Sequence, residues 1–132
     1  MMTKKQKILV VDDDPSYRQL ITHQLTKAGY EVLIAKDGQE AISWLRNDQQ
    51  RPNLIVLDLL MPRYSGIEVL ESLRAFPFKL PVILVSGAEW PIARQGMALA
   101  APDAYLTKPF KMQDLLEKIG DLLLPVSESD LT

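Results

Sequence analysis

The sequence predicts an α/β fold in which a parallel β-sheet is covered by helices on both faces. Apolar runs of three or four residues recur along the chain and alternate with longer segments whose apolar residues have helical spacing. Such alternation is typical of parallel sheets, and strands that are apolar at every position are typical of burial on both faces. Four of the five runs end in side chains suited to chemistry: acids after the first and third, a serine after the fourth and a lysine after the fifth. Functional groups are therefore expected at one edge of the sheet.

The composition fits a single domain of average character and excludes several kinds of chemistry. The chain has 132 residues, is 47% hydrophobic and 24% charged, and contains no cysteine, which excludes disulfides, thiolate catalysis and cysteine metal sites. A formal net charge of −2 gives no basic surface for nucleic acid or an anionic membrane. No signal sequence or membrane-spanning stretch is evident. We expect a cytoplasmic domain that binds neither nucleic acid nor membrane.

The first strand and helix are predicted from an apolar run, three acids and a proline. Residues 8–11 form the apolar run, and Asp12, Asp13 and Asp14 follow it. Asp14 followed by proline is typical of a helix start, and apolar residues then recur at helical spacing. Gly29 is predicted to end this helix. The residues expected on the apolar side of the helix are Tyr17, Leu20, Ile21, Gln24, Leu25 and Ala28.

The central strand is predicted from four large apolar residues that run directly into Asp58. Before it, residues 32–35 form a second strand, and Asp37 is expected to cap a helix that extends to Leu45. Burying a carboxylate without a partner is strongly unfavourable. Asp58 is therefore expected at the carboxyl end of its strand, the edge at which open α/β sheets bind ligands.

The second half of the chain continues the alternation. Ser65 is expected to cap a third helix, residues 82–85 form a strand that ends at Ser86, and a weak helix signal covers residues 91–100. A short strand then ends at Lys108, and a final helix follows, with apolar residues at three- and four-residue spacing. These patterns predict one domain over residues 5–124 and a polar C-terminal tail over residues 125–132.

The strand ends together predict a phosphoryl-transfer site. Parallel strands bring Asp12, Asp13, Asp58, Ser86 and Lys108 to one edge. Three close carboxylates repel one another, and Mg²⁺, which prefers oxygen ligands, removes the conflict. A carboxylate is a competent nucleophile for a phosphoryl group, so Asp58 is the candidate acceptor. The lysine ammonium and the serine hydroxyl are suited to contact phosphoryl oxygens.

The chain resembles the receiver domains of bacterial two-component response regulators. The resemblance covers roughly residues 5–124. It is carried by four motifs together: Ile8-Leu9-Val10-Val11-Asp12-Asp13-Asp14-Pro15, Leu57-Asp58-Leu59-Leu60-Met61-Pro62 with Gly66, Val85-Ser86-Gly87-Ala88, and Tyr105-Leu106-Thr107-Lys108-Pro109-Phe110.

The resemblance implies a flavodoxin-like (βα)5 fold, a doubly wound sheet with strand order 2-1-3-4-5. It implies that Asp58 is the phosphoacceptor and that the Lys108–Pro109 bond is cis. It also implies roles for six further groups: Mg²⁺ binding by Asp12, Asp13 and the backbone carbonyl of Leu60, phosphate contact by Lys108, and conformational switching by Ser86 and Tyr105.

The resemblance further implies partners and a mode of action. A sensor histidine kinase or a phosphotransfer protein would donate the phosphoryl group, and a changed surface on the fourth helix, fifth strand and fifth helix would bind an unknown protein target. We expect a monomer or weak dimer that is not itself an enzyme. Trp90 has two open interpretations, a partner contact or a packed side chain.

Other interpretations are compatible with parts of the pattern. The chain could be a receiver domain cut from a longer regulator with an output domain. An aspartyl-phosphate phosphatase is disfavoured, because its second acid would stand at Leu60. A flavin-binding module is disfavoured because Asp12, Asp13 and Asp14 would repel a phosphate. A phosphorylation-independent interaction domain of the same fold usually lacks one of the site residues, and none is missing here.

Overall fold

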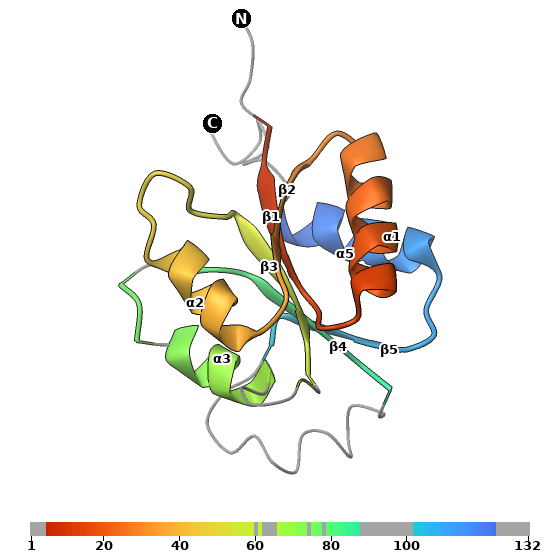
Figure 1. The fold of residues 1–132 in the computed structure, drawn as a ribbon. Helices are drawn as coiled ribbons and strands as arrows, with labels where there is room; N and C mark the ends of the chain where they lie inside the picture. The colour runs from red at the N-terminus through yellow and green to blue at the C-terminus, as the bar shows by residue number, and fades with distance from the viewer. Residues whose placement is uncertain are drawn as a thin grey trace, which may run out of the picture.

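The computed structural model describes residues 5–59, 61, 66–73, 75–77, 79–87 and 102–123. These residues form a five-stranded parallel sheet with helices packed on it, shown in Figure 1. The strand order is β2-β1-β3-β4-β5, which confirms the predicted flavodoxin-like topology. In chain order the elements are β1 (Lys7–Val11), α1 (Pro15–Lys27), β2 (Glu31–Ala35), α2 (Gly38–Leu45), β3 (Leu54–Asp58), α3 (Gly66–Leu73), β4 (Val82–Ser86), β5 (Ala104–Thr107) and α5 (Met112–Leu122).

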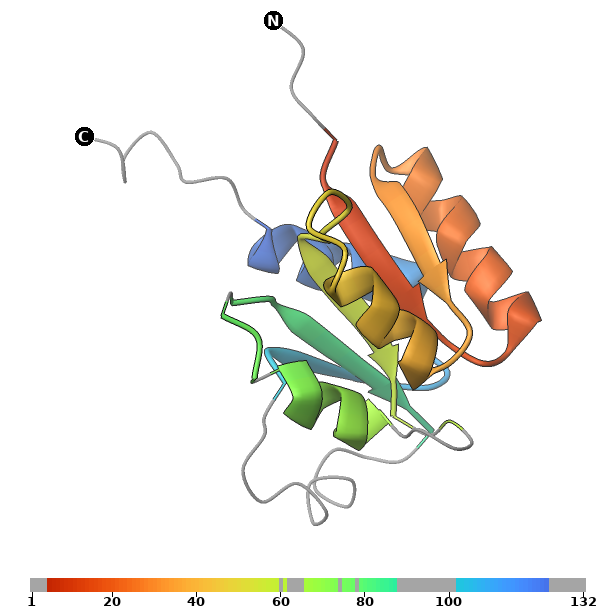
Figure 2. The ribbon, with the colours of Figure 1, turned by 60° about the vertical axis from the view of Figure 1, so that its left-hand side comes forward.

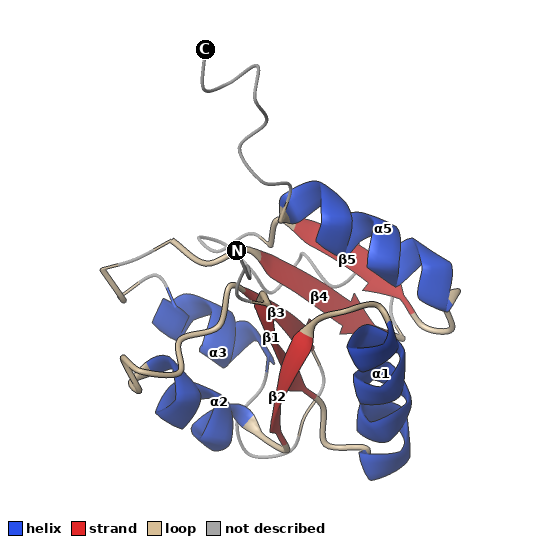
Figure 3. Ribbon diagram, turned by 90° about the horizontal axis from the view of Figure 1, so that it is seen from above, coloured by secondary structure: helices blue, strands red, loops and turns tan. Residues whose placement is uncertain are grey.

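The helices lie in two layers with the sheet between them. Figure 3 shows α1 and α5 on one face of the sheet and α2 and α3 on the other. The predicted helix over residues 91–100 lies outside the described residues, as do Trp90 and the predicted cap at Ser65. Among the residues that are described, no helix combines the length and apolar character needed to cross a membrane.

The two hydrophobic cores follow from the alternation of side chains along the strands. In β1, Leu9 and Val11 pack with α2 and α3, whereas Ile8 and Val10 pack with α1 and α5. The strands β3 and β4 divide their side chains in the same way. All four of these β1 residues are at most 1% exposed. Because both faces are buried, the apolar runs predicted from the sequence are continuous and do not alternate with polar residues.

The ends of α1 are as predicted. The Asp14 carboxylate accepts hydrogen bonds from the backbone N–H groups of Ser16 (2.9 Å) and Tyr17 (3.4 Å), and Pro15 is the first helical residue. Gly29 has a φ of 101°, a conformation that glycine adopts without steric cost. The acids that precede the helix are therefore held close to its first turn.

The predicted apolar side of α1 was wrong at two positions, Leu20 and Ala28, and Ala28 is the exposed cap that follows the last helical residue. Ile21 and Leu25, four residues apart, are fully buried, but Leu20 is 48% exposed. Successive helical residues are about 100° apart, so Leu20 lies beside the stripe that Ile21 and Leu25 define. His23 is exposed, as its position relative to that stripe predicts.

The register of the strands brings their carboxyl ends together. Val11 pairs with Leu57, Asp58 with Val85 and Ser86 with Thr107. The five strands run in the same direction, which can be followed in Figure 2. Hydrogen bonds continue the ladder just past the strands, because the Lys108 N–H donates to the Ser86 carbonyl at 2.7 Å. Asp12 after β1, Asp58 at the end of β3 and Lys108 after β5 therefore meet at one edge.

A backbone carbonyl of the outer strand β2 accepts a hydrogen bond from a tryptophan side chain. The Trp44 indole Nε1–H donates to the Ile34 carbonyl at 2.8 Å. Ile34 itself is 49% exposed. This tryptophan belongs to α2, so the contact also fixes the helix against the strand.

We expect the substitution Asp37→Ala to lower the free energy of unfolding by about 1 kcal/mol. The Asp37 carboxylate accepts from the Glu40 N–H (2.9 Å), and the Glu40 carboxylate accepts from the Lys36 N–H (2.9 Å), so both side chains stabilise the first turn of α2. Urea denaturation measures the change. Asp37→Asn is the control, because asparagine is an equally good cap; equal losses for the two variants would contradict the prediction.

Candidate functional site

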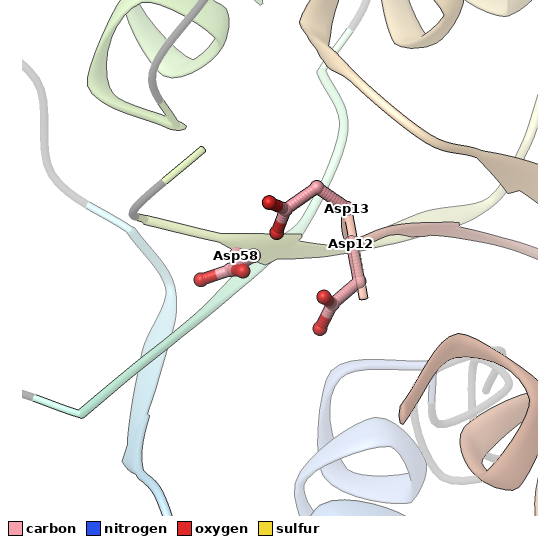
Figure 4. Close-up of side chains that lie close together, drawn as sticks. All are labelled: Asp12, Asp13 and Asp58. Atoms are coloured by element: carbon pink, nitrogen blue, oxygen red, sulfur yellow. The ribbon is translucent and has the colours of Figure 1, made fainter. Parts of the chain in front are cut away.

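Three carboxylates gather where β1 and β3 end. Asp12, Asp13 and Asp58 each place one carboxylate oxygen within 4.8 Å of the others, and Figure 4 shows the three side chains together. Asp12 and Asp58 are 3% and 6% exposed, whereas Asp13 is exposed to solvent. The cluster predicted from the sequence is therefore present, with two buried members and one that solvent reaches.

The position of Asp58 depends on a close backbone approach by Gly66. The Gly66 N–H donates to the Leu59 carbonyl at 2.9 Å. A Cβ atom at Gly66 would lie 2.7 Å from the Leu59 Cα and would also collide with the Asp58 carbonyl. Any larger residue would displace the backbone that carries Asp58.

Asp12 is held by contacts on several sides. One carboxylate oxygen accepts from the Asp14 N–H at 2.9 Å, and the other accepts from the Lys108 ammonium at 3.2 Å. The Arg18 guanidinium donates to the Asp12 backbone carbonyl at 2.7 Å. These contacts fix the orientation of Asp12, and they leave the exposed Asp13 the more accessible member of the acidic pair.

Lys108 is the cation of the site. Its Nζ lies 3.2 Å from Asp12 Oδ2 and 3.8 Å from Asp58 Oδ2, and its side chain is 25% exposed. The same atom lies 4.2 Å from the centre of the Tyr17 ring. The Tyr17 ring in turn meets Phe110 edge to face, with centroids 5.9 Å apart. The Lys108–Pro109 peptide bond is cis, as expected from the resemblance.

Tyr17 is affected electrostatically by the cluster. Partial burial, followed by the negative charges of Asp12 and Asp58, raises the pKa of Tyr17 from 10.0 to about 12. A phenolate beside two carboxylates would add a further negative charge to the site. The phenol therefore stays neutral through the physiological range.

Ser86 and Tyr105 come from the neighbouring strands. Ser86 is the last residue of β4 and is 1% exposed, at the same edge as the acids. Tyr105 pairs in register with Leu84 and packs, half-buried, against the core under α2 and α3. The predicted backbone ligand, the Leu60 carbonyl, lies outside the described residues.

Sequence reasoning missed two contacts of α1 with the site. Tyr17 was placed in the core-facing stripe of the helix, and Arg18 was given no role. Both stand in the first turn, a few residues after Asp14. Helical side chains tilt toward the N-terminus of their helix, which here points at the acids. This rule applied to the predicted cap would have placed both side chains near the site.

Among the residues that the structure describes, the carboxylates of the site outnumber the cations that contact their oxygens. In this part of the chain the Lys108 ammonium lies close to two of the carboxylates, and the Arg18 guanidinium contacts the Asp12 backbone carbonyl. Repulsion among buried like charges is costly, and a divalent cation bound by oxygen ligands relieves it. Carboxylates at these separations match the oxygen donors that Mg²⁺ prefers. The donor set therefore fits Mg²⁺.

A family model and curated relatives both match this chain along most of its length. The family model for the response regulator receiver domain matches residues 8–120. The chain is 37% identical over 124 residues to the response regulator MprA of Mycolicibacterium vanbaalenii, covering 94% of this chain and 53% of that protein. It thus spans about half the length of the curated relatives it matches.

Solved structures resemble this fold over nearly all of the chain. The chemotaxis response regulator CheY4 of Vibrio cholerae superposes with a TM-score of 0.81 at 32% identity, covering 91% of this chain and 100% of that one. The receiver domain of the Francisella response regulator 1452 gives a TM-score of 0.80 at 31% identity, covering 89% and 96%.

We expect the substitution Gly66→Ala to destabilise the fold by about 1–3 kcal/mol, the usual range for overpacking against atoms that cannot easily move. Urea denaturation measures the effect. Gly120→Ala, in α5, is the matched control because nothing lies within 4 Å of its added Cβ, and alanine there should raise stability. A Gly66→Ala protein as stable as wild type would disprove the steric account.

The raised pKa of Tyr17 predicts that the free energy of unfolding falls at high pH. Its pKa is about 12 in the fold and 10.0 unperturbed, so between these values the folded chain keeps a proton that the unfolded chain loses. The stability tied to this proton is complete below pH 10 and is lost as the pH rises toward 12. Denaturation of the wild type and of Tyr17→Phe across this window should show the wild type losing stability more steeply. Parallel curves would contradict the raised pKa.

Proposed function

The chain belongs to the response regulator receiver domain family, and from this premise we propose that it is a phosphorylation-controlled switch with Asp58 as phosphoacceptor. Receiver domains are signalling domains of two-component systems. The observation that carries the assignment of Asp58 is its position: it is a buried carboxylate within reach of two further acids and one ammonium.

The proposed reaction is a transfer from a phosphorylated histidine to Asp58. A carboxylate oxygen of Asp58 attacks phosphorus and forms an acyl phosphate as the P–N bond to the donor imidazole breaks. The imidazole nitrogen keeps the bonding electron pair and takes up a proton. Phosphoryl transfer of this kind depends mainly on positioning and charge neutralisation. The fixed contacts of Asp12 and the close approach of Gly66 supply that positioning.

Asp12, Asp13 and Asp58 would hold Mg²⁺, with the Leu60 carbonyl as a further ligand. When bound, the cation supplies positive charge to the oxygens of the transferring group. The exposed Asp13 is the more direct ligand of the acidic pair, because Asp12 is occupied by Lys108 and the Asp14 N–H. The donor chemistry of the three carboxylates supports this role.

Lys108 and Ser86 would contact the phosphoryl group after transfer. The ammonium already stands 3.8 Å from Asp58, so a small shift from Asp12 brings it to a phosphoryl oxygen. Ser86 lies at the same edge, and its hydroxyl is a donor for another oxygen. The added negative charge draws both donors toward Asp58.

The proposed output is a change at Tyr105. Movement of Ser86 toward the phosphoryl group leaves space beside β4, into which the half-buried Tyr105 turns. This would alter a surface that includes β5 and α5 and, as the resemblance implies, the helix predicted over residues 91–100, where an unidentified protein target would bind. The donor is a sensor histidine kinase or a phosphotransfer protein.

We further propose a receiver domain over residues 5–124, a polar tail over 125–132, a cytoplasmic location, and a monomer or weak dimer. The domain would not turn over a substrate, beyond slow loss of its own phosphoryl group. The second candidate is a receiver domain that forms part of a longer regulator, since the matched relatives are about twice as long as this chain. A phosphatase is disfavoured, because Leu60 offers no side-chain acid two residues after Asp58.

The central experiment is phosphorylation with acetyl phosphate and Mg²⁺, followed by intact-protein mass spectrometry. The wild type should gain one phosphoryl group, and Asp58→Asn should gain none. Asp48→Asn, an acid with an 85% exposed side chain, is the matched control and should behave as the wild type. Equal labelling of the wild type and Asp58→Asn would refute the assignment.

Calorimetric Mg²⁺ titration of the same proteins tests the metal site separately. Asp13→Asn should weaken Mg²⁺ binding by roughly tenfold or more, since even loss of a group supporting a metal ligand has an effect of that size. Asp48→Asn should not change it. Unaltered affinity in Asp13→Asn would remove Asp13 from the ligand set.

A further inference from the structure

The face of the Tyr17 ring lies against the Lys108 ammonium. The Nζ atom is 4.2 Å from the ring centre, well within the distance at which a cation is attracted to an aromatic face. Lys108 is contributed by the segment after β5 and Tyr17 by the first turn of α1. The contact therefore joins two parts of the chain across the edge of the sheet.

The ring is itself held in place. Tyr17 packs against the core under α1 and α5, and Phe110 meets it edge to face at an interplanar angle of 83°. Edge-to-face pairs are a favoured aromatic geometry. Phe110 stands two residues after Lys108, so the segment that carries the lysine also supports the ring that faces it.

An aromatic face restrains an ammonium differently from a carboxylate. An ammonium has three N–H donors, and each hydrogen bond to Asp12 occupies one. Attraction to a ring face is broad in direction and requires no particular N–H. Lys108 can therefore stay against Tyr17 while its donors move from Asp12 toward Asp58. The ring also covers part of a side chain that is only 25% exposed, which limits competition from water.

We propose that Tyr17 is a positioning residue for Lys108, whose ring face holds the ammonium beside Asp58 and thereby speeds phosphorylation. The ring acts through the lysine and makes no contact with the phosphoryl group. The effect on rate rests on the proposed function of Asp58, whereas the placement of the ammonium does not.

The ring and the hydroxyl are separated by two substitutions. Tyr17→Leu removes the aromatic face, and Tyr17→Phe keeps it. With acetyl phosphate and Mg²⁺, Tyr17→Leu should be phosphorylated roughly three- to tenfold more slowly than wild type, the size expected for a partly solvated cation–π contact. Tyr17→Phe should stay close to wild type. Mg²⁺ affinity should be retained in both, because neither substitution removes a ligand.

Tyr30→Leu is the matched control. Tyr30 is also half-buried and packs against the same core, but it precedes β2 at the opposite edge of the sheet from the acids. The Tyr30→Leu protein should take up a phosphoryl group on Asp58 at the wild-type rate. A normal rate in Tyr17→Leu, an equal loss in Tyr17→Phe, or a joint loss of rate and Mg²⁺ affinity in Tyr17→Leu would each overturn the proposal.

A spectroscopic measurement tests the placement of the ammonium without phosphorylation. In a proton–carbon spectrum of lysine labelled at Cε, the Lys108 signal should be shifted upfield by the ring. Lys108→Arg identifies the signal by removing it. Tyr17→Phe should keep the shift and Tyr17→Leu should lose it. An unshifted Lys108 signal in the wild type would refute the proposal. A shifted signal in a protein that takes no phosphoryl group would support the placement of the ammonium by Tyr17 while refuting the proposed function.

Discussion

The balance of charge between Lys108 and the acids is the constraint on which the site depends. Two of the three carboxylates are almost fully buried, at a distance from one another at which like charges repel strongly. The lysine is close to both buried acids, 3.2 Å from Asp12 and 3.8 Å from Asp58. Among the described residues, this ammonium offsets part of the repulsion between the carboxylates. The remaining repulsion is of the kind that a divalent cation with oxygen ligands relieves.

The parallel sheet brings together site residues that are far apart in the sequence. Asp12 and Lys108 are 96 residues apart in the chain, and yet Asp12 directly follows β1 and Lys108 directly follows β5, while Asp58 ends β3. Burial on both faces fixes the register of β1 and β3. A shift of one residue in any of these strands would exchange its two faces between the cores. The apolar packing therefore determines the site geometry as firmly as the polar contacts do.

Sequence patterns predicted the parts of the structure that follow from local rules. The five strands, the caps at Asp14 and Asp37 and the left-handed Gly29 are all consequences of burial, hydrogen bonding or glycine's conformational freedom. The three carboxylates were expected together because parallel strands share an edge. Tyr17 was assigned to the core only, since spacing along a helix does not reveal what lies beyond its first turn. Leu20 was misplaced, because hydrophobicity alone does not define a helix face.

The indole contact on β2 bears on how the protein behaves at high concentration. β2 is an outer strand of the sheet, and the unpaired backbone groups of such a strand can pair with a strand from another molecule. The Trp44 side chain occupies the carbonyl of Ile34, the residue whose exposed apolar side chain would otherwise favour such pairing. Trp44 thus protects this edge from self-association through the sheet. Loosening of α2 would remove this contact and leave the Ile34 carbonyl available to a strand of another molecule.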